Sequence, residues 1–187
     1  ALPISISGYA EIIRNGLVRS EDIPRFAGNI YNETQRLITL VEDIIKLSQL
    51  DERAVELERT EADLHAIARD VAERLHSAAE QNGIHIEVLG GPAVVTGVPR
   101  ILDEMIFNLA DNAVKYSRAG GSVRITAGMQ AGSAFIEVAD DGIGIPERDR
   151  ERVFERFYRV DKARSREAGG TGLGLAIAKE IVESHGG

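Results

Sequence analysis

Apolar residues recur every seven positions through the first part of the chain. Two heptad positions are filled by apolar side chains, namely Ile23, Ile30, Leu37 and Ile44 at one and Phe26, Leu40 and Leu47 at the other. Glu33 is the one polar break in this seam, which is typical of helices that pack side by side. Because Pro24 suits a first helical turn, the pattern predicts a helix over residues 23–51.

A second helical pattern precedes this one, over residues 4–18. Its apolar residues lie on one side, and Asn15 and Gly16 are expected to loosen its end. Two helices joined by a short loop form an antiparallel hairpin with an apolar seam that needs a cover. A second copy of the chain would complete a four-helix bundle, so we expect a homodimer through residues 1–52.

Residues 53–187 alternate between strand and helix patterns. Alternating apolar and polar residues predict strands over 55–59, 84–89, 93–96, 122–127 and 134–139, with the last two joined by a turn at 130–133. Helices are expected over 63–79, 99–116 and 173–184, with Asp63 as a cap and Pro99 opening the second. The predicted class is α+β: a helical hairpin followed by an α/β sandwich with helices on one side of a mixed sheet.

Composition excludes several kinds of partner. The chain has 22 Lys and Arg against 30 Asp and Glu, a net charge of −8, which disfavours binding to nucleic acid or to an anionic membrane surface. It has no cysteine, so disulfides and thiolate metal sites are excluded. No run of about 18 apolar residues and no leader pattern occurs. We expect a cytoplasmic chain that meets a membrane only through segments outside it.

Polar residues interrupt the apolar pattern of the predicted helix over 99–116. Glu104, Asn108 and Asn112 follow at spacings of four and lie along one stripe, with Lys115 and Tyr116 at the helix end. Leaving a buried amide without a partner costs about 1–3 kcal/mol. The stripe therefore favours a ligand, although exposed solubilising residues would give the same pattern.

A carboxylate and two glycines follow the predicted strand over 134–139. Asp140 can accept a hydrogen bond from an exocyclic amine such as that of adenine, while Gly142 and Gly144 let backbone approach a flat ligand. A plain loop is the alternative interpretation of this segment.

A second glycine-rich segment opens the predicted last helix. Gly170, Gly172 and Gly174 leave backbone N–H groups and the positive end of the helix dipole available for phosphate, or they simply cap the helix. The spacing matches neither the P-loop nor the dinucleotide fingerprint.

Between the two glycine segments lies an aromatic stretch, residues 153–160. Aromatic residues at this spacing are usually core; the alternative is a lid anchored by Phe154 and Phe157. In that case Lys162, Arg164 and Arg166 could meet a triphosphate.

The order of these four segments closely resembles the N box, first glycine box, F box and second glycine box of sensor histidine kinases. Residues 5–11 are similar to those that follow the phospho-accepting His of these kinases, and residues 41–48 resemble the end of their second helix. The resemblance implies a dimerisation hairpin followed by a GHKL, or Bergerat-type, ATP-binding domain. It also implies transfer of the ATP γ-phosphoryl group to a His, and then to an Asp in the receiver domain of a response regulator.

The resemblance also implies site residues. Asn112 corresponds to the Mg²⁺ ligand and Asn108 to a supporting contact, and both are implied to be catalytic together with Lys115. Mg²⁺ takes oxygen ligands and keeps waters, so few protein oxygens suffice. The implied nucleotide-binding residues are Asn108, Asn112, Lys115, Tyr116, Asp140, Gly142, Gly144, Ile145, Tyr158, Arg159, Gly170, Thr171, Gly172, Leu173 and Gly174.

This sequence also departs from the family pattern. The phosphorylated His normally precedes the Pro of the first helix in a His-Glu pair, and His65, His76, His85 and His185 all lie outside that context. We expect residues 1–52 to be a truncated hairpin and residues 53–187 to lack the family's last strand. Such a chain would bind Mg²⁺ and ATP without phosphorylating itself.

Two other functions remain open from the sequence. A GHKL-type ATPase would generally have an acidic base one turn before the metal-binding Asn, where this chain has Asn108. A non-catalytic module that senses ATP and dimerises is the other alternative.

Overall fold

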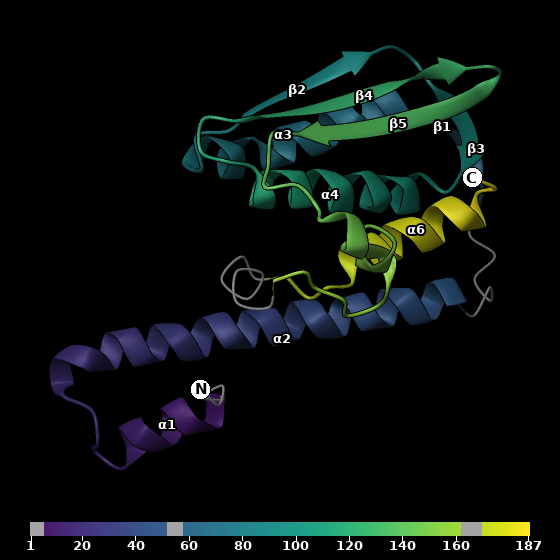
Figure 1. The fold of residues 1–187 in the computed structure, drawn as a ribbon. Coiled ribbons are helices and arrows are strands. Elements are labelled where there is room, and N and C mark those ends of the chain that lie inside the picture. The colour runs from purple at the N-terminus through teal and green to yellow at the C-terminus, as the bar shows by residue number, and fades with distance from the viewer. Residues whose placement is uncertain (1–5, 52–57, 162–169) are drawn as a thin grey trace.

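The computed structural model describes residues 6–51, 58–161 and 170–187. They form a helical hairpin and an α/β domain that packs against the second half of the hairpin's long helix (Figure 1). No helix in the described part of the chain is both long and apolar enough to cross a membrane.

The hairpin consists of α1 (Ile6–Arg14) and α2 (Ile23–Asp51), separated by the short 3-10 turn η1 (Ser20–Asp22). The predicted bounds of α2 are confirmed. α1 ends earlier than predicted because Gly16 takes a φ of +66°, which breaks the helix. The Tyr9 ring meets the Phe26 ring edge-on at 5.5 Å between centroids, and this contact joins the two helices.

The α/β domain contains two small sheets. The larger has the order β2 (His85–Gly90), β4 (Ser122–Gln130), β5 (Ser133–Asp140), with β2 parallel and β5 antiparallel to β4. The smaller pairs β1 (Thr60–Asp63) antiparallel with β3 (Val94–Gly97). The predicted mixed sheet is therefore confirmed, but two of its expected strands form a separate pair.

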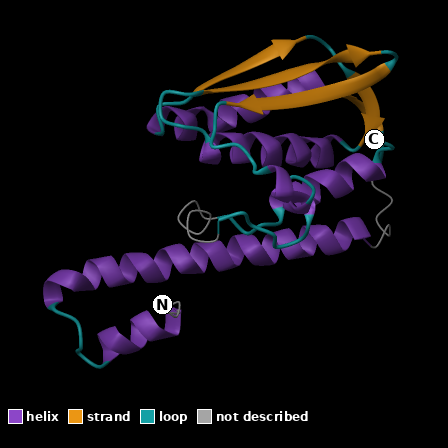
Figure 2. Ribbon diagram, viewed as in Figure 1, coloured by secondary structure: helices purple, strands orange, loops and turns teal. Residues whose placement is uncertain are grey.

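Helices α3 (Leu64–Gln81) and α4 (Pro99–Tyr116) cover one face of the larger sheet, and α6 (Gly174–Ser184) packs on α4 (Figure 2). Two 3-10 turns, η2 (Glu147–Asp149) and η3 (Arg152–Phe154), lie between β5 and α6. The fully buried side chains between these layers include Val71, Ile106, Ile125 and Ile177. Burying each such side chain contributes about 1.5–3 kcal/mol, so this core fixes α4 and α6 relative to the sheet.

Asp63 caps α3, as predicted. Its Oδ1 accepts hydrogen bonds from the backbone N–H groups of His65 (3.0 Å) and Ala93 (2.8 Å). The bond to Ala93 also ties the cap to the segment leading into β3.

The strand predicted over residues 55–59 is wrong where the structure describes it. Residues 55–57 lie outside the described part, and Glu58 and Arg59 belong to no strand. The strand lies at Thr60–Asp63 because those residues pair with β3, with Thr60 opposite Gly97. The β4–β5 hairpin is confirmed with a tighter turn than predicted, since Ala131 and Gly132 both have positive φ, as the two-residue turns that join twisted strands require.

The heptad seam of α2 is divided between two environments. Leu47 is 5% exposed and Leu40 packs against the core of the α/β domain, whereas Leu37 and Ile44 are 46% and 44% exposed. In the second half of α2, one heptad position, Leu40 and Leu47, is therefore covered within the chain, whereas the other, Leu37 and Ile44, faces outward.

Candidate functional site

A cavity of about 610 Å³ lies between α2, α4, the end of β5 and the segment that leads into α6. Its size is in the range of small-molecule and cofactor sites. All but two of the predicted binding residues line it: Asn108, Asn112, Lys115, Tyr116, Asp140, Gly144, Ile145, Tyr158, Arg159, Gly170, Thr171, Gly172 and Gly174. The fold thus brings together four segments that are widely separated in the sequence.

The two remaining predicted residues, Gly142 and Leu173, support the cavity wall without lining it. The Gly142 N–H donates to Asp140 Oδ1 at 2.8 Å, and a Cβ at Gly142 would collide with that oxygen and with the carbonyl of Tyr116. Gly142 is therefore needed for its small size. The Leu173 side chain is fully buried in the core and anchors the start of α6.

The two asparagines of α4, Asn108 and Asn112, both line the cavity. Asn108 Nδ2 is buried and has no hydrogen-bond partner among the described residues. Such a donor costs about 1–3 kcal/mol unless a ligand or water accepts from it. Gly174 allows α6 to begin beside this stripe, because a Cβ there would lie 3.3 Å from Asn108 Oδ1.

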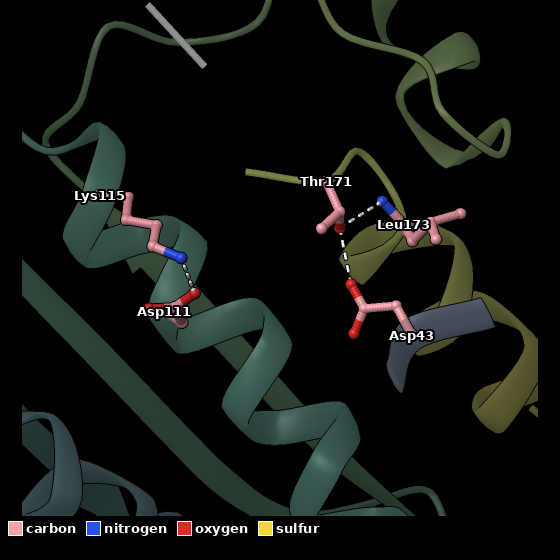
Figure 3. A network of polar contacts seen from close by, with 5 residues as sticks. All are labelled: Asp43, Asp111, Lys115, Thr171 and Leu173. Carbon is pink, nitrogen blue, oxygen red and sulfur yellow. Dashed lines mark hydrogen bonds and ion pairs between the residues drawn. The ribbon is translucent and has the colours of Figure 1, made fainter. Parts of the chain in front are cut away.

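Lys115 lines the cavity but already has a partner. Its Nζ lies 2.6 Å from Asp111 Oδ2, one turn earlier on α4 (Figure 3). A phosphate that binds Lys115 must share it with Asp111 or draw it away.

Tyr158 lies on the cavity wall with its hydroxyl turned to a buried carboxylate. The hydroxyl donates to Asp149 Oδ1 at 2.6 Å, and the Arg152 guanidinium carbon lies 4.2 Å from the centroid of the Tyr158 ring. The bond to Asp149 raises the pKa of the Tyr158 hydroxyl. Asp149 is only 6% exposed, and no sequence pattern singled it out. Tyr158 is therefore held in place as part of the cavity wall.

The F box does not contribute its phenylalanines to the core, since Phe154 and Phe157 are 42% and 56% exposed. Phe157 has a φ of +66°, and its N–H donates to the carbonyl of Gly172 at 2.9 Å. Gly172 has a φ of +78°, and a Cβ there would lie 3.1 Å from Phe157 C and Tyr158 O. The F box and the second glycine segment thus interlock through backbone. The lid cations expected at Lys162, Arg164 and Arg166 lie outside the described residues.

Sequence reasoning missed that α2 forms one wall of the cavity, through Thr39, Glu42, Asp43 and Lys46. Thr39, Asp43 and Lys46 are spaced by four and then three residues, a polar stripe that could have indicated a covered face. Asp43 Oδ2 accepts from the Thr171 hydroxyl at 2.7 Å (Figure 3). Lys46 Nζ lies 2.6 Å from Glu104 Oε1 of α4. Burial raises the pKa of Asp43.

Acidic side chains outnumber basic ones among the described residues of the cavity wall. A highly charged anion would therefore need a cation to accompany it. The side-chain oxygen of Asn112 fits Mg²⁺, a hard ion that takes oxygen ligands and keeps much of its water shell when it bridges phosphates.

Several known proteins are similar to this chain. The family model described as "Histidine kinase-, DNA gyrase B-, and HSP90-like ATPase" (HATPase_c) matches residues 97–187. The sensor histidine kinase WalK of Bacillus subtilis is 39% identical over 187 aligned positions, which cover 98% of this chain and 31% of WalK. The chain therefore spans about a third of the length of the curated relatives that it matches.

Solved structures also match. The mycobacterial sensor histidine kinase MprB is 34% identical, with a TM-score of 0.59 over 68% of this chain and 80% of that structure. The histidine kinase ThkA, in complex with the response regulator protein TrrA, is 24% identical. Its TM-score is 0.74 over 97% of this chain and 50% of that one, and this likeness concerns the fold alone.

Proposed function

The chain belongs to the sensor histidine kinases, and from that premise we propose that it binds ATP with Mg²⁺ and directs its γ-phosphoryl group to a histidine of the dimerisation helix. An aspartate in the receiver domain of a response regulator would then accept the group. The observation that carries the proposal is the convergence of the asparagine stripe, Asp140 and the second glycine segment on one cavity.

Asp140 is suited to hold the adenine ring. The Gly142 N–H occupies Oδ1, which leaves Oδ2 to accept a hydrogen bond from the exocyclic amine. Gly144 and the half-exposed Ile145 line the same part of the cavity and offer backbone and apolar surface to the ring.

The other end of the cavity is suited to phosphates. The buried Asn108 amide donor has no partner in the part of the chain that the structure describes, and Gly170, Gly172 and Gly174 place backbone N–H groups near the N-terminus of α6. Asn112 would hold Mg²⁺, which when bound supplies charge neutralisation on the phosphates.

The proposed reaction is a phosphoryl transfer, in which the main task of the protein is to position the reactants. The acceptor imidazole nitrogen forms a P–N bond to the γ-phosphorus as the P–O bond to ADP breaks, so the leaving group carries away its electron pair. Protein groups mainly orient the reactants and balance charge in such a transfer. Lys115 can serve here once a phosphate draws its Nζ from Asp111.

The outward apolar positions of α2 support assembly of two copies. Leu37, Val41, Ile44 and Ile45 are each between 44% and 54% exposed along one helix. A second hairpin covering them would complete a four-helix bundle and bury apolar surface worth about 25 cal/mol per Å². We infer that the dimer forms through this face.

None of the four histidines of the chain is proposed as the acceptor, because all lie in the α/β domain. His65 and His76 are on α3 and His85 is on β2. His185 Nε2 lies 3.3 Å from the backbone nitrogen of Val98, a distance that makes it the acceptor of that N–H.

An extended variant tests this function. The chain is joined at Ala1 to the His-Glu-containing helix of a relative and incubated with Mg²⁺ and ATP labelled at the γ-phosphate. We expect acid-labile, base-stable label on the added histidine and none when that histidine is replaced by Gln. Release of inorganic phosphate without any protein label would favour the ATPase alternative. Binding of ATP with neither label nor hydrolysis would favour the non-catalytic one.

A further inference from the structure

Polar and apolar contacts among the described residues join the α/β domain to α2. The Thr171 hydroxyl lies 2.7 Å from Asp43, Lys46 lies 2.6 Å from Glu104, and Leu47 adds a buried apolar contact. Figure 3 shows that Asp43 reaches Thr171 directly at the start of α6. The contact therefore joins the dimerisation helix to the second glycine segment.

The Thr171 hydroxyl has no donor to spare in this arrangement. A hydroxyl carries one O–H, and here that proton is donated to Asp43. The same oxygen accepts from the Leu173 N–H at 3.3 Å, which holds the segment that opens α6. A phosphate oxygen seeking the Thr171 donor must displace the Asp43 carboxylate.

The negative charges on α2 also oppose binding of a phosphate beside Thr171. Glu42 and Asp43 both line the cavity from α2, so a triphosphate entering beside Thr171 meets like charges on that wall. Burial also raises the pKa of Asp43, which means that its ionised form is held there at some cost in solvation.

We propose that a triphosphate and α2 compete for the second glycine segment, so that ATP binding breaks the Asp43–Thr171 bond and loosens the α/β domain from α2. This inference rests on the proposed nucleotide site and concerns its regulation. A domain held on α2 has its Thr171 donor engaged by Asp43, and a domain carrying ATP is released to move toward an acceptor histidine. By linkage, any signal that tightens the contact with α2 lowers the affinity for ATP.

The test measures nucleotide affinity by calorimetry in Asp43→Ala, in Thr171→Val and in the double variant. Asp43→Ala should bind Mg²⁺-ATP about 5- to 20-fold more tightly than the native chain, since the competing acceptor is gone. Adenosine, which has no phosphates, should bind both equally. In the Thr171→Val background the gain should disappear, because the two side chains act through one bond.

Glu42→Gln is the matched control, since it removes the same charge from the same wall, and the structure gives Glu42 no bond to Thr171. It should raise ATP affinity roughly twofold at most, as expected for an exposed charge. Equal ATP affinities of the native chain and Asp43→Ala would overturn the competition and leave the nucleotide site standing. The competition would also be overturned if Asp43→Ala still raised ATP affinity in the Thr171→Val background, or if Glu42→Gln raised it by the same factor. Absence of ATP binding in every variant would instead refute the proposed function, and the competition with it.

Discussion

Replacing Asp140 by Asn tests the adenine end of the site with almost no change in shape. In the native chain the Gly142 N–H donates to Oδ1 at 2.8 Å. The same N–H would fix the amide oxygen of the new Asn in that position, so its NH₂ group would face the adenine amine. Two donors would then oppose each other where a carboxylate had accepted a hydrogen bond.

The size of the effect follows from the lost interaction. A hydrogen bond to a charged group contributes about 1.5–3 kcal/mol, and each 1.4 kcal/mol changes affinity tenfold. We therefore expect Asp140→Asn to weaken Mg²⁺-ATP binding by about 10- to 100-fold. Stability should change little, because Asp140 is exposed and keeps its bond from Gly142.

Calorimetric titration with ATP and with ITP, whose base has a carbonyl in place of the amine, gives the clearest readout. The variant should lose its preference for ATP over ITP, because its NH₂ group can donate to that carbonyl. Asp141→Asn is the matched control: Asp141 accepts from the Ser122 N–H and hydroxyl, and it is absent from the cavity wall as described. An unchanged affinity and an unchanged ATP preference in Asp140→Asn would refute the assignment of Asp140 to adenine.

Three further outcomes are expected. Gly172→Ala should lower stability to urea by about 1–2 kcal/mol more than Gly132→Ala does: both glycines have positive φ, but only Gly172 has backbone within 3.1 Å of the added methyl. Asp63→Ala should lower the free energy of unfolding by about 1–2 kcal/mol, and Asp63→Asn should lower it by less. Because backbone N–H donors, that of Ala93 first, lower the pKa of Asp63 on folding, the carboxylate's contribution is full above its unfolded pKa. Native stability should therefore fall toward that of Asp63→Asn as pH drops through the lowered pKa; a constant difference across acid melts would contradict this. Leu37→Glu should shift the chain from dimer to monomer in sedimentation equilibrium, whereas the exposed polar substitution Gln35→Glu should not.

Local signals in the sequence were sufficient for the long helices. The heptad pattern and Pro24 predicted α2, and Pro99 together with the apolar pattern predicted α4, both with the bounds that the structure has. Helix ends depend on hydrogen bonds within a few residues, so nearby residues determine them. The asparagine stripe, Asp140 and the glycine segments were identifiable for a similar reason, because their residue types are unusual where they stand.

Long-range pairing decided what the sequence left open. β1 lies at Thr60–Asp63 because it pairs with β3, and the alternation a few residues earlier carried no information about that partner. The buried Asp149 was missed for the same reason, since its role appears only when the F box folds back and brings the Tyr158 hydroxyl to it.

The sequence by itself determined the helices, the order of the four polar segments and the chemistry that each can perform, because these depend on neighbouring residues and on side-chain type. Only the tertiary structure decided that α2 closes the cavity and that Thr171 donates to Asp43. Those contacts depend on how separate elements pack, and the packing is selected by burial of the whole core, which no single segment encodes.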